Sequence, residues 1–356
     1  MAKKLFKILA LDGGGIRGIL PATILKAIEE KTGKPTAELF DLVAGTSTGG
    51  IIAAGLLVPH EQNPAQPKYS AETLLNLYVK EGARIFKKRK GVRVAGSNIT
   101  DPTYEHQGLE GVLSEYFSDN TLKEVLKPLV VTSYDLEKRM PFYFRSRLAQ
   151  NQTLEEDFLL RHVTRATSAA PTYFEPALIH NGKGERLVLV DGGVCANNPS
   201  IVAYGEAEEL DRINRTQSTT AQRLRDSREH GVKKVITEPD IAKSSDYFML
   251  SIGTGNGLRP YAYEKTKEWG ALKWTIPAID ILMQGSAEVN HNHMQYIMPE
   301  SPLGRHYIRF NTLVDKIYSD MANAKPEIIH GLQAIADRFV MDNEDRIEYV
   351  CRKLVE

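Results

Sequence analysis

The sequence predicts an α/β protein, and three stretches of the chain carry this prediction. In residues 5–30, and again in residues 40–58, an apolar strand-like run ends in a glycine-rich turn and leads directly into a helical pattern. In the third stretch, an apolar run over 186–190 leads into Asp191 and two glycines. Strands that alternate with helices across short turns are typical of α/β folds.

The length and composition are those of an ordinary globular protein. The chain has 356 residues, 42% of them hydrophobic and 25% charged, and its formal net charge is zero. A chain without net charge has no overall attraction to nucleic acid, so we expect no nucleic-acid partner. No internal repeat or long linker divides the chain. We therefore expect a single domain over 1–356, with a polar insertion near 214–245 and a helical C-terminal extension.

Cysteine usage and the N-terminus indicate a cytoplasmic protein. The two cysteines, Cys195 and Cys351, lie far apart, which fits neither a disulfide framework nor a zinc site. The apolar run over 5–11 is shorter than the core of a secretory signal and ends at Asp12 rather than at a cleavage site. No apolar stretch reaches transmembrane length. Any action on a membrane is therefore expected at its surface.

The remaining elements follow from the apolar patterns along the chain. The predicted helices are 19–30, 51–58, 71–83, 105–117, 154–167, 200–213, 274–298, 327–339 and 345–355. The predicted strands are 5–11, 40–44, 129–134, 142–145, 186–190, 247–252 and 306–310. A proline-rich loop is expected over 59–69. Ser70 should cap the helix that follows this loop, and Asn197–Pro199 should cap the helix from Ser200.

A serine lies at the turn between the strand 40–44 and the helix from Ile51. The turn, residues 45–49 (GTSTG), has the form G-x-S-x-G. A sharp strand-to-helix turn would hold the hydroxyl above the sheet, and the helix N-terminus would favour negative charge there. Such small residues also occur in ordinary loops, but the strand and the helix around them favour a nucleophile. Ser47 is therefore the candidate.

The first glycine turn, residues 12–18 (DGGGIRG), contains the spacing G-x-G-x-x-G. This spacing is found in dinucleotide-binding folds, where the next strand ends in an acidic residue that binds the ribose. Here the next strand ends in the serine turn instead. We therefore favour the alternative, in which the run supplies adjacent backbone N–H groups to an oxyanion.

Asp191 is the candidate base, because open α/β sheets place their sites at the carboxyl ends of strands. An aspartate is a weak base, so partial burial would have to raise its pKa. A histidine after the acid would complete a triad, and these qualify by order: His230, His291, His293, His306 and His330. None lies in a glycine-rich loop at a strand end. We expect all of them to be structural, and a serine–aspartate dyad is physically feasible.

A basic run covers residues 84–94, where six lysines and arginines are interleaved with Ile, Phe and Val. Such a run either contacts anionic lipid headgroups or forms the solvated end of a helix, and the sequence does not decide between them.

Three motifs stand in order along the chain: 12–18 (DGGGIRG), 45–49 (GTSTG) and 191–193 (DGG). Residues 166–174 (ATSAAPTYF) and 251–255 (SIGTG) accompany them. In type, order and rough spacing, this set resembles the patatin-like phospholipase family over about residues 5–255. The resemblance implies a three-layer α/β/α sandwich with a mainly parallel sheet. It also implies hydrolysis of lipid acyl esters without a metal or other cofactor.

The resemblance assigns a role to each matching residue. It implies Ser47 as nucleophile and Asp191 as base, with Arg17 placing the glycine loop or a phosphate. Its oxyanion hole would be formed by three consecutive glycines: Gly13, Gly14 and Gly15. Membrane phospholipid would be the substrate, reached by peripheral contact with the membrane. Two other functions stay open, a ligand- or nucleotide-binding signalling protein that does not use Ser47, and an acyltransferase.

Control by a ligand is a further expectation. The run 197–199 (NNP) and the lack of a signal sequence look more like bacterial family members, among them CapV-type effectors that cyclic nucleotides activate in anti-phage defence. A cyclic nucleotide would act at 214–245, at the chain after Gly255, or at a subunit contact in an oligomer. The cations near this segment are Arg212, Arg215, Arg223, Arg225, Arg228, Lys233 and Lys234. A solvated charged helix is the alternative.

Overall fold

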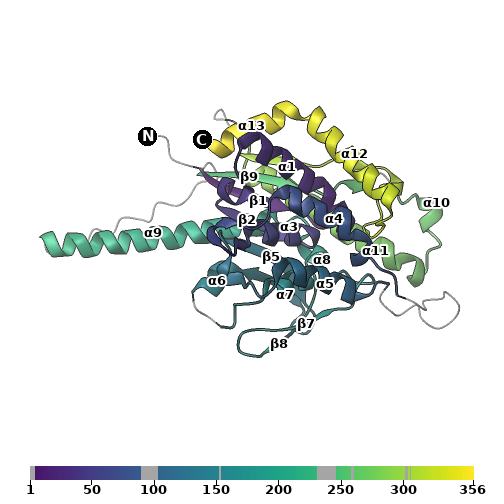
Figure 1. The fold of residues 1–356 in the computed structure, drawn as a ribbon, viewed down its shortest axis with the longest axis horizontal. Coiled ribbons are helices and arrows are strands. Elements are labelled where there is room, and N and C mark those ends of the chain that lie inside the picture. Colours follow the sequence, from purple (N-terminus) through teal and green to yellow (C-terminus); the bar gives the residue numbers. More distant parts are fainter. Residues whose placement is uncertain are drawn as a thin grey trace.

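The computed structural model describes residues 5–89, 103–151, 154–230, 246–257, 260–300, 304 and 306–356. Its centre is an eight-stranded sheet with helices on both faces (Figure 1). The strands lie in the order β11 (Tyr307–Phe310), β9 (Tyr247–Ile252), β1 (Phe6–Leu11), β2 (Leu42–Thr46), β5 (Leu129–Asp135), β8 (Arg186–Asp191) and β7 (Ala177–His180), and β6 (Met140–Arg145) also pairs with β5. From β11 to β5 the strands are parallel, whereas β6 and β8 run antiparallel to β5.

Successive residues of the central strands face two different apolar cores, one on each side of the sheet. Leu9 and Val43 belong to one core, and Ile8 and Leu42 belong to the other. Successive side chains of a strand point to opposite faces of the sheet, and both faces are buried here. This explains why the sequences of these strands are continuous apolar runs. The three-layer architecture with a mostly parallel sheet is confirmed.

The first core is covered mainly by α1 (Ile19–Thr32), α3 (Thr48–Leu57), α4 (Ala71–Ile85), α5 (His106–Phe117), α7 (Leu160–Thr167), α12 (Pro326–Asp342) and α13 (Glu344–Val355). The second is covered by α9 (Ser200–His230) and α11 (Ala271–Ile297). The shorter helices are η1 (Gly15–Gly18), α2 (Thr36–Leu39), η2 (Leu122–Glu124), α6 (Ser146–Gln150), α8 (Gly193–Ala196), α10 (Tyr263–Thr266) and η4 (Lys316–Tyr318). The short strands are β3 (Pro59–His60), β4 (Asn63–Pro67), β10 (Asn256–Gly257) and β12 (Leu313–Val314). None of the helices in the described part of the chain combines the length and apolar composition needed to cross a membrane.

Most predicted elements are present, and both predicted caps are confirmed. The Ser70 side chain accepts a hydrogen bond from the Thr73 N–H, and Asn198 Oδ1 accepts one from the Ser200 N–H at 3.0 Å. Each cap satisfies an N–H group that the first turn of a helix leaves without an internal partner.

Three predictions about individual segments differ from the structure. The proline-rich stretch 59–69 is not a plain loop, because its ends pair as the small hairpin of β3 and β4. The helix expected over 154–167 begins only at Leu160. The helix expected to end at 213 continues to His230, so the first half of the polar segment 214–245 extends α9, which projects from the body of the molecule (Figure 1). Residues 231–245 lie outside the described residues.

Candidate active site

Ser47 lies at the sharp turn between β2 and α3. Its backbone φ of 54° and ψ of −124° fall in a region that costs a residue with a side chain about 1–3 kcal/mol. A Cβ on Gly45 would approach the Gly49 carbonyl oxygen to 2.2 Å, and one on Gly49 would approach the Leu11 carbonyl oxygen to 2.3 Å. The turn therefore excludes side chains at both glycines. The Ser47 N–H donates to Thr167 Oγ1 at 2.8 Å, which anchors the strained residue.

The antiparallel pairing of β8 with β5 brings Asp191 close to the serine turn. Because β6 pairs along one edge of β5, β2 and β8 must share the other edge. Thr46, the last residue of β2, pairs with Thr132, and Asp191, the last residue of β8, pairs with Ser133. The two strands thus approach end to end and bring Ser47 beside the carboxylate. Asp191 is the last residue of its strand, as predicted, but β8 is antiparallel to β5, so the carboxylate approaches Ser47 from the opposite direction.

The Asp191 carboxyl group is buried, with only 1% of the residue exposed. Its Oδ1 accepts a hydrogen bond from the Gly193 N–H at 2.7 Å. Its Oδ2 makes no hydrogen bond of regular geometry with the described residues. Burial raises the pKa of Asp191 to about 7, against the lowering effects of the nearby Ser47 hydroxyl and the Gly193 N–H. The carboxylate is therefore a much better proton acceptor than an exposed aspartate.

The glycine loop places two free amide groups next to this pair. The Gly13 N–H donates to the Asn197 carbonyl at 3.1 Å and is not free to bind an oxyanion in this conformation. Among the described residues, none accepts a hydrogen bond from the N–H of Gly14 or Gly15. Gly15 has a φ of 60°, which favours glycine, and it lines the same pocket as Ser47. Of the three glycines predicted to form the oxyanion hole, only Gly14 and Gly15 thus have an N–H group available.

Arg17 holds the glycine loop through hydrogen bonds to backbone carbonyl groups. Its buried guanidinium donates to the Gly14 carbonyl at 3.4 Å and to the Gly255 carbonyl at 3.0 Å. Thr254 Oγ1 adds a hydrogen bond of 2.7 Å to the Gly13 carbonyl. The segment at the end of β9 therefore ties the loop down by its carbonyl groups. Of the two roles proposed for Arg17, these contacts favour placing the loop.

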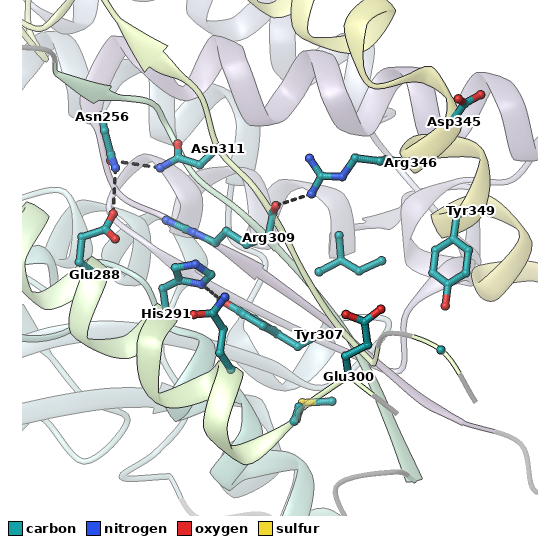
Figure 2. Close-up of a pocket in the computed structure, with 14 residues that line it drawn as sticks. Asn256, Glu288, His291, Glu300, Tyr307, Arg309, Asn311, Asp345, Arg346 and Tyr349 are labelled. Atoms are coloured by element: carbon teal, nitrogen blue, oxygen red, sulfur yellow. Dashed lines mark hydrogen bonds between the residues drawn. The ribbon is translucent and has the colours of Figure 1, made fainter. Parts of the chain in front are cut away.

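A second arginine, Arg309, supports the loop from β11. Its guanidinium binds both carboxylate oxygens of Asp12 at 2.8 and 2.5 Å and also reaches Ser251 Oγ at 2.7 Å. Figure 2 shows the other side of Arg309, which lines a cavity of about 860 Å³ between α11 and α13. Neither Ser47 nor Asp191 lines that cavity. We therefore assign the chemistry to the smaller pocket above Ser47.

Ser47 and Asp191 open into a pocket with mostly apolar and aromatic walls. These walls include Ile51, Tyr78, Ile85, Phe86, Leu109, Tyr173, Phe174, Met283 and Met321. No histidine from the described residues lines this pocket. His291 instead shares a hydrogen bond with the Tyr307 hydroxyl, and His306 Nδ1 contacts the Tyr247 carbonyl. A serine and an aspartate are thus brought together without a histidine, as the dyad prediction requires.

Comparison with known proteins agrees with this geometry. The sequence model of the family described as patatin-like phospholipase matches residues 9–204, which is more than half of the chain. The chain belongs to this family. The matched range contains the glycine loop, the serine turn and Asp191. The protein is therefore a carboxylic ester hydrolase of the patatin type, as expected from its sequence.

Patatin-like relatives align along nearly the whole chain. Patatin-like protein 1 of Oryza sativa subsp. indica is 30% identical over 374 residues, covering 98% of this chain and 84% of the relative. Patatin-like protein 1 of Arabidopsis thaliana is 29% identical over 365 residues, covering 94% and 81%. Among solved structures, VipD from Legionella pneumophila is 13% identical with a TM-score of 0.35, covering 94% of this chain and 67% of VipD. These two sequence relatives are plant proteins, so the bacterial CapV-type subtype stays a prediction.

Proposed function

We propose that the patatin-like protein cleaves acyl esters of phospholipids with Ser47 as nucleophile and Asp191 as base. One observation supports this most directly. A buried carboxyl group, its pKa raised to about 7, lies beside a serine on a strained turn and faces an apolar pocket. A raised pKa is what an aspartate needs to accept a proton from a hydroxyl group near neutral pH.

The reaction then follows acyl transfer through a covalent intermediate. Asp191 takes the proton from Ser47 Oγ as that oxygen attacks the ester carbonyl. The N–H groups of Gly14 and Gly15 stabilise the negative charge that develops on the carbonyl oxygen. The protonated Asp191 gives its proton to the departing lysophospholipid alcohol. Water, activated by Asp191, then releases the fatty acid and restores the serine.

The apolar walls of the pocket support a lipid substrate over a small polar ester. Phe86, Phe174 and Met283 offer surface that an acyl chain can cover, and transfer of this chain from water is favourable. Two alternatives share parts of this site. An acyltransferase would form the same acyl-enzyme and pass the acyl group to another alcohol. A signalling protein would bind its ligand without activating Ser47.

The direct test is product analysis by mass spectrometry after incubation of the purified protein with phospholipid vesicles. We expect free fatty acid and lysophospholipid in equal amounts, and covalent labelling of Ser47 by a fluorophosphonate. A labelled serine that transfers the acyl group only to an added alcohol would favour the acyltransferase. The absence of both labelling and product would leave the signalling alternative.

Activation by a cyclic nucleotide in anti-phage defence is a finer proposal that rests on the sequence resemblance. In the described part of the segment, Arg212 pairs with Glu209, and Arg215 pairs with Asp211 and Asp246. The side chains of the other proposed cations lie outside the described residues. The test is phospholipase activity across a panel of cyclic di- and trinucleotides. High activity without nucleotide, unchanged by the panel, would contradict this proposal and leave a constitutive hydrolase.

A further inference from the structure

Helix α11 exposes an apolar stripe to solvent over most of its length. The exposed members are Trp274, Ile281, Leu282, Val289 and Tyr296, with exposed fractions between 39% and 84%. Trp274 and Ile281 are seven residues apart, as are Leu282, Val289 and Tyr296 in turn. Positions seven apart lie on one helical face, so these side chains form a continuous stripe.

The opposite face of α11 is also apolar, because Ile279, Met283 and Met294 are buried against the protein. The two acids of the helix serve internal contacts. Asp280 accepts a hydrogen bond from the Tyr261 hydroxyl at 2.8 Å, and Glu288 accepts one from Asn256 at 2.8 Å. An ordinary surface helix points its charged residues outward and buries a single apolar face. Apart from Lys273 in its first turn, the outward side of α11 thus carries no charged side chain, and this favours an apolar partner outside the described fold.

Aromatic side chains continue the stripe beyond the N-terminus of α11. The rings of Tyr261 and Trp269 lie 5.8 Å apart, and those of Trp269 and Trp274 lie 5.2 Å apart. Tyr263, on α10, is 73% exposed, and the Lys267 ammonium lies 5.9 Å from the centre of its ring. Tryptophan, tyrosine and lysine combine an apolar body with a polar end, which suits the headgroup level of a bilayer.

This segment borders the entrance to the candidate active site. Met283 lines the Ser47 pocket and packs in a cluster with Ile279, Met321 and Tyr173. A second cavity, which is distinct from the cavity beside Arg309, has a volume of about 400 Å³ and is lined by Tyr261 and other residues of the segment. It shares Tyr173 and Met321 with the Ser47 pocket. The second cavity therefore lies between the aromatic cluster and Ser47. In Figure 1, α10 lies at the margin of the molecule opposite the projecting end of α9.

We infer that this surface docks the protein on a phospholipid bilayer. We call it the α10–α11 face and define it as Tyr263, Trp274, Ile281, Leu282, Val289 and Tyr296. The inference rests on the proposed function, because a phospholipase must draw a lipid from the membrane into its pocket. The bilayer covers the apolar stripe, and the second cavity then opens toward the lipid. A second copy of the chain on this face would instead obstruct that entrance.

The only two tryptophans of the sequence, Trp269 and Trp274, both lie beside or within this face, so intrinsic fluorescence reports on it directly. The experiment mixes the Ser47→Ala protein, which should not hydrolyse the lipid, with phosphatidylcholine–phosphatidylglycerol vesicles whose acyl chains carry bromine. We expect quenching of the fluorescence on binding, because bromine quenches tryptophan only at short range. Binding without quenching would overturn the inference.

A pair of variants on the stripe tests the face independently of the fluorescence. Leu282→Gln with Val289→Gln removes two apolar side chains that are 54% and 53% exposed and seven residues apart. Loss of their burial should weaken vesicle affinity by roughly tenfold or more. The matched control, Leu154→Gln with Leu178→Gln, replaces leucines of similar exposure, 60% and 59%, on other elements and should leave affinity unchanged. Equal loss in both pairs would contradict the inference.

The readouts separate docking from catalysis. In the Ser47 wild-type background, the Leu282→Gln and Val289→Gln pair should slow hydrolysis of vesicles but not of a soluble short-chain ester. Quenching by bromolipid without any fatty acid release would support the docking face and contradict the proposed function. Vesicle hydrolysis without quenching would support the function and contradict the face. A dimer that the Leu282→Gln and Val289→Gln pair dissociates, with vesicle affinity unchanged, would make the face an interface between copies and overturn the inference.

Discussion

Asp191 links the chemistry of the site to pH, because it works as a base only when it is ionised. Burial raises its pKa to about 7, so its active form accumulates as the pH rises through that value. We expect kcat/KM for a soluble ester to increase along an acidic limb with an apparent pKa near 7. The measurement is a pH–rate profile with Ser47 intact. A rate that is already maximal near the ordinary aspartate pKa would contradict Asp191 as the base.

The same shift predicts that Asp191 costs stability. A carboxyl group whose pKa is higher in the folded than in the unfolded protein favours folding at low pH and loses that contribution as the pH rises through the folded value. A shift from 3.8 to about 7 corresponds to about 4 kcal/mol. Asp191→Asn should therefore abolish hydrolysis yet raise the thermal midpoint, more at alkaline than at acidic pH. Ser47→Ala is the control, and an equal gain at all pH values would contradict the shift.

Ser47→Ala should lower turnover by several orders of magnitude, because it removes the nucleophile. The fold should stay intact, because the change removes one oxygen at the turn and needs no repacking. His291→Ala and His293→Ala should keep near-wild-type turnover. His291 contacts Tyr307, and His293 contacts its own helix at the Val289 carbonyl. The measurement is steady-state hydrolysis of a soluble ester by folded variants. Loss of activity in either histidine variant would replace the dyad with a triad.

At the scale of single residues, local motifs predicted the candidate pair but not the residues that hold it. Ser47 has a glycine two residues away on either side, Asp191 is followed by two glycines, and the chemistry of each is visible from these neighbours in sequence. Arg309, by contrast, meets Asp12 across 297 positions of sequence and has no local motif. Thr167, whose Oγ1 accepts a hydrogen bond from the Ser47 N–H, lies 120 positions away from Ser47 in the sequence. Thr167 does, however, fall within the accompanying ATSAAPTYF motif.

The glycine loop acts as one element, and a substitution in it should affect more than one N–H group. A Cβ on Gly14 would approach Thr254 Oγ1 to 2.2 Å, and this hydroxyl also binds the Gly13 carbonyl. Gly14→Ala should therefore displace both Thr254 and the oxyanion donors and lower kcat by on the order of a hundredfold or more. The control is Thr254→Ala, which removes the hydroxyl without crowding the loop and should lose less. Equal losses would assign the effect to Thr254.

The basic run at the end of α4 is largely engaged in ion pairs where it is described. Arg84 Nη2 lies 2.6 Å from Glu115, Lys87 lies 2.8 Å from Glu105, and Arg89 lies 3.6 Å from Glu175. Residues 90–94 lie outside the described residues. Exposed pairs of this kind stabilise a fold little, but they compete with lipid headgroups for the same cations. The contacts therefore favour an apolar over a basic docking surface.

At the scale of the whole molecule, the parallel half of the sheet could be predicted and the antiparallel half could not. Strands β1, β2 and β9 are buried on both faces and give apolar runs that need no long-range information. The direction of β8 depends on β6 and β7, and β7 alternates between buried and exposed residues. The end-to-end approach of β2 and β8 is a property of the assembled sheet. The apolar patterns identified β6 and β8 without fixing their partners, and they did not identify β7.

The last prediction concerns how the whole protein depends on salt. The chain has no net charge and its proposed docking face is apolar, so vesicle affinity should change little with ionic strength. Binding through the basic run would behave differently, because each lysine or arginine contributes roughly 1 kcal/mol near an anionic surface and the contribution is screened within about 10 Å at 0.1 M salt. The measurement is vesicle co-sedimentation of the Ser47→Ala protein at low and high salt. A loss of affinity of about tenfold or more at high salt would identify the basic run as the main contact. A change of less than about threefold, together with loss of binding in the Leu282→Gln and Val289→Gln pair, would assign the contact to α11.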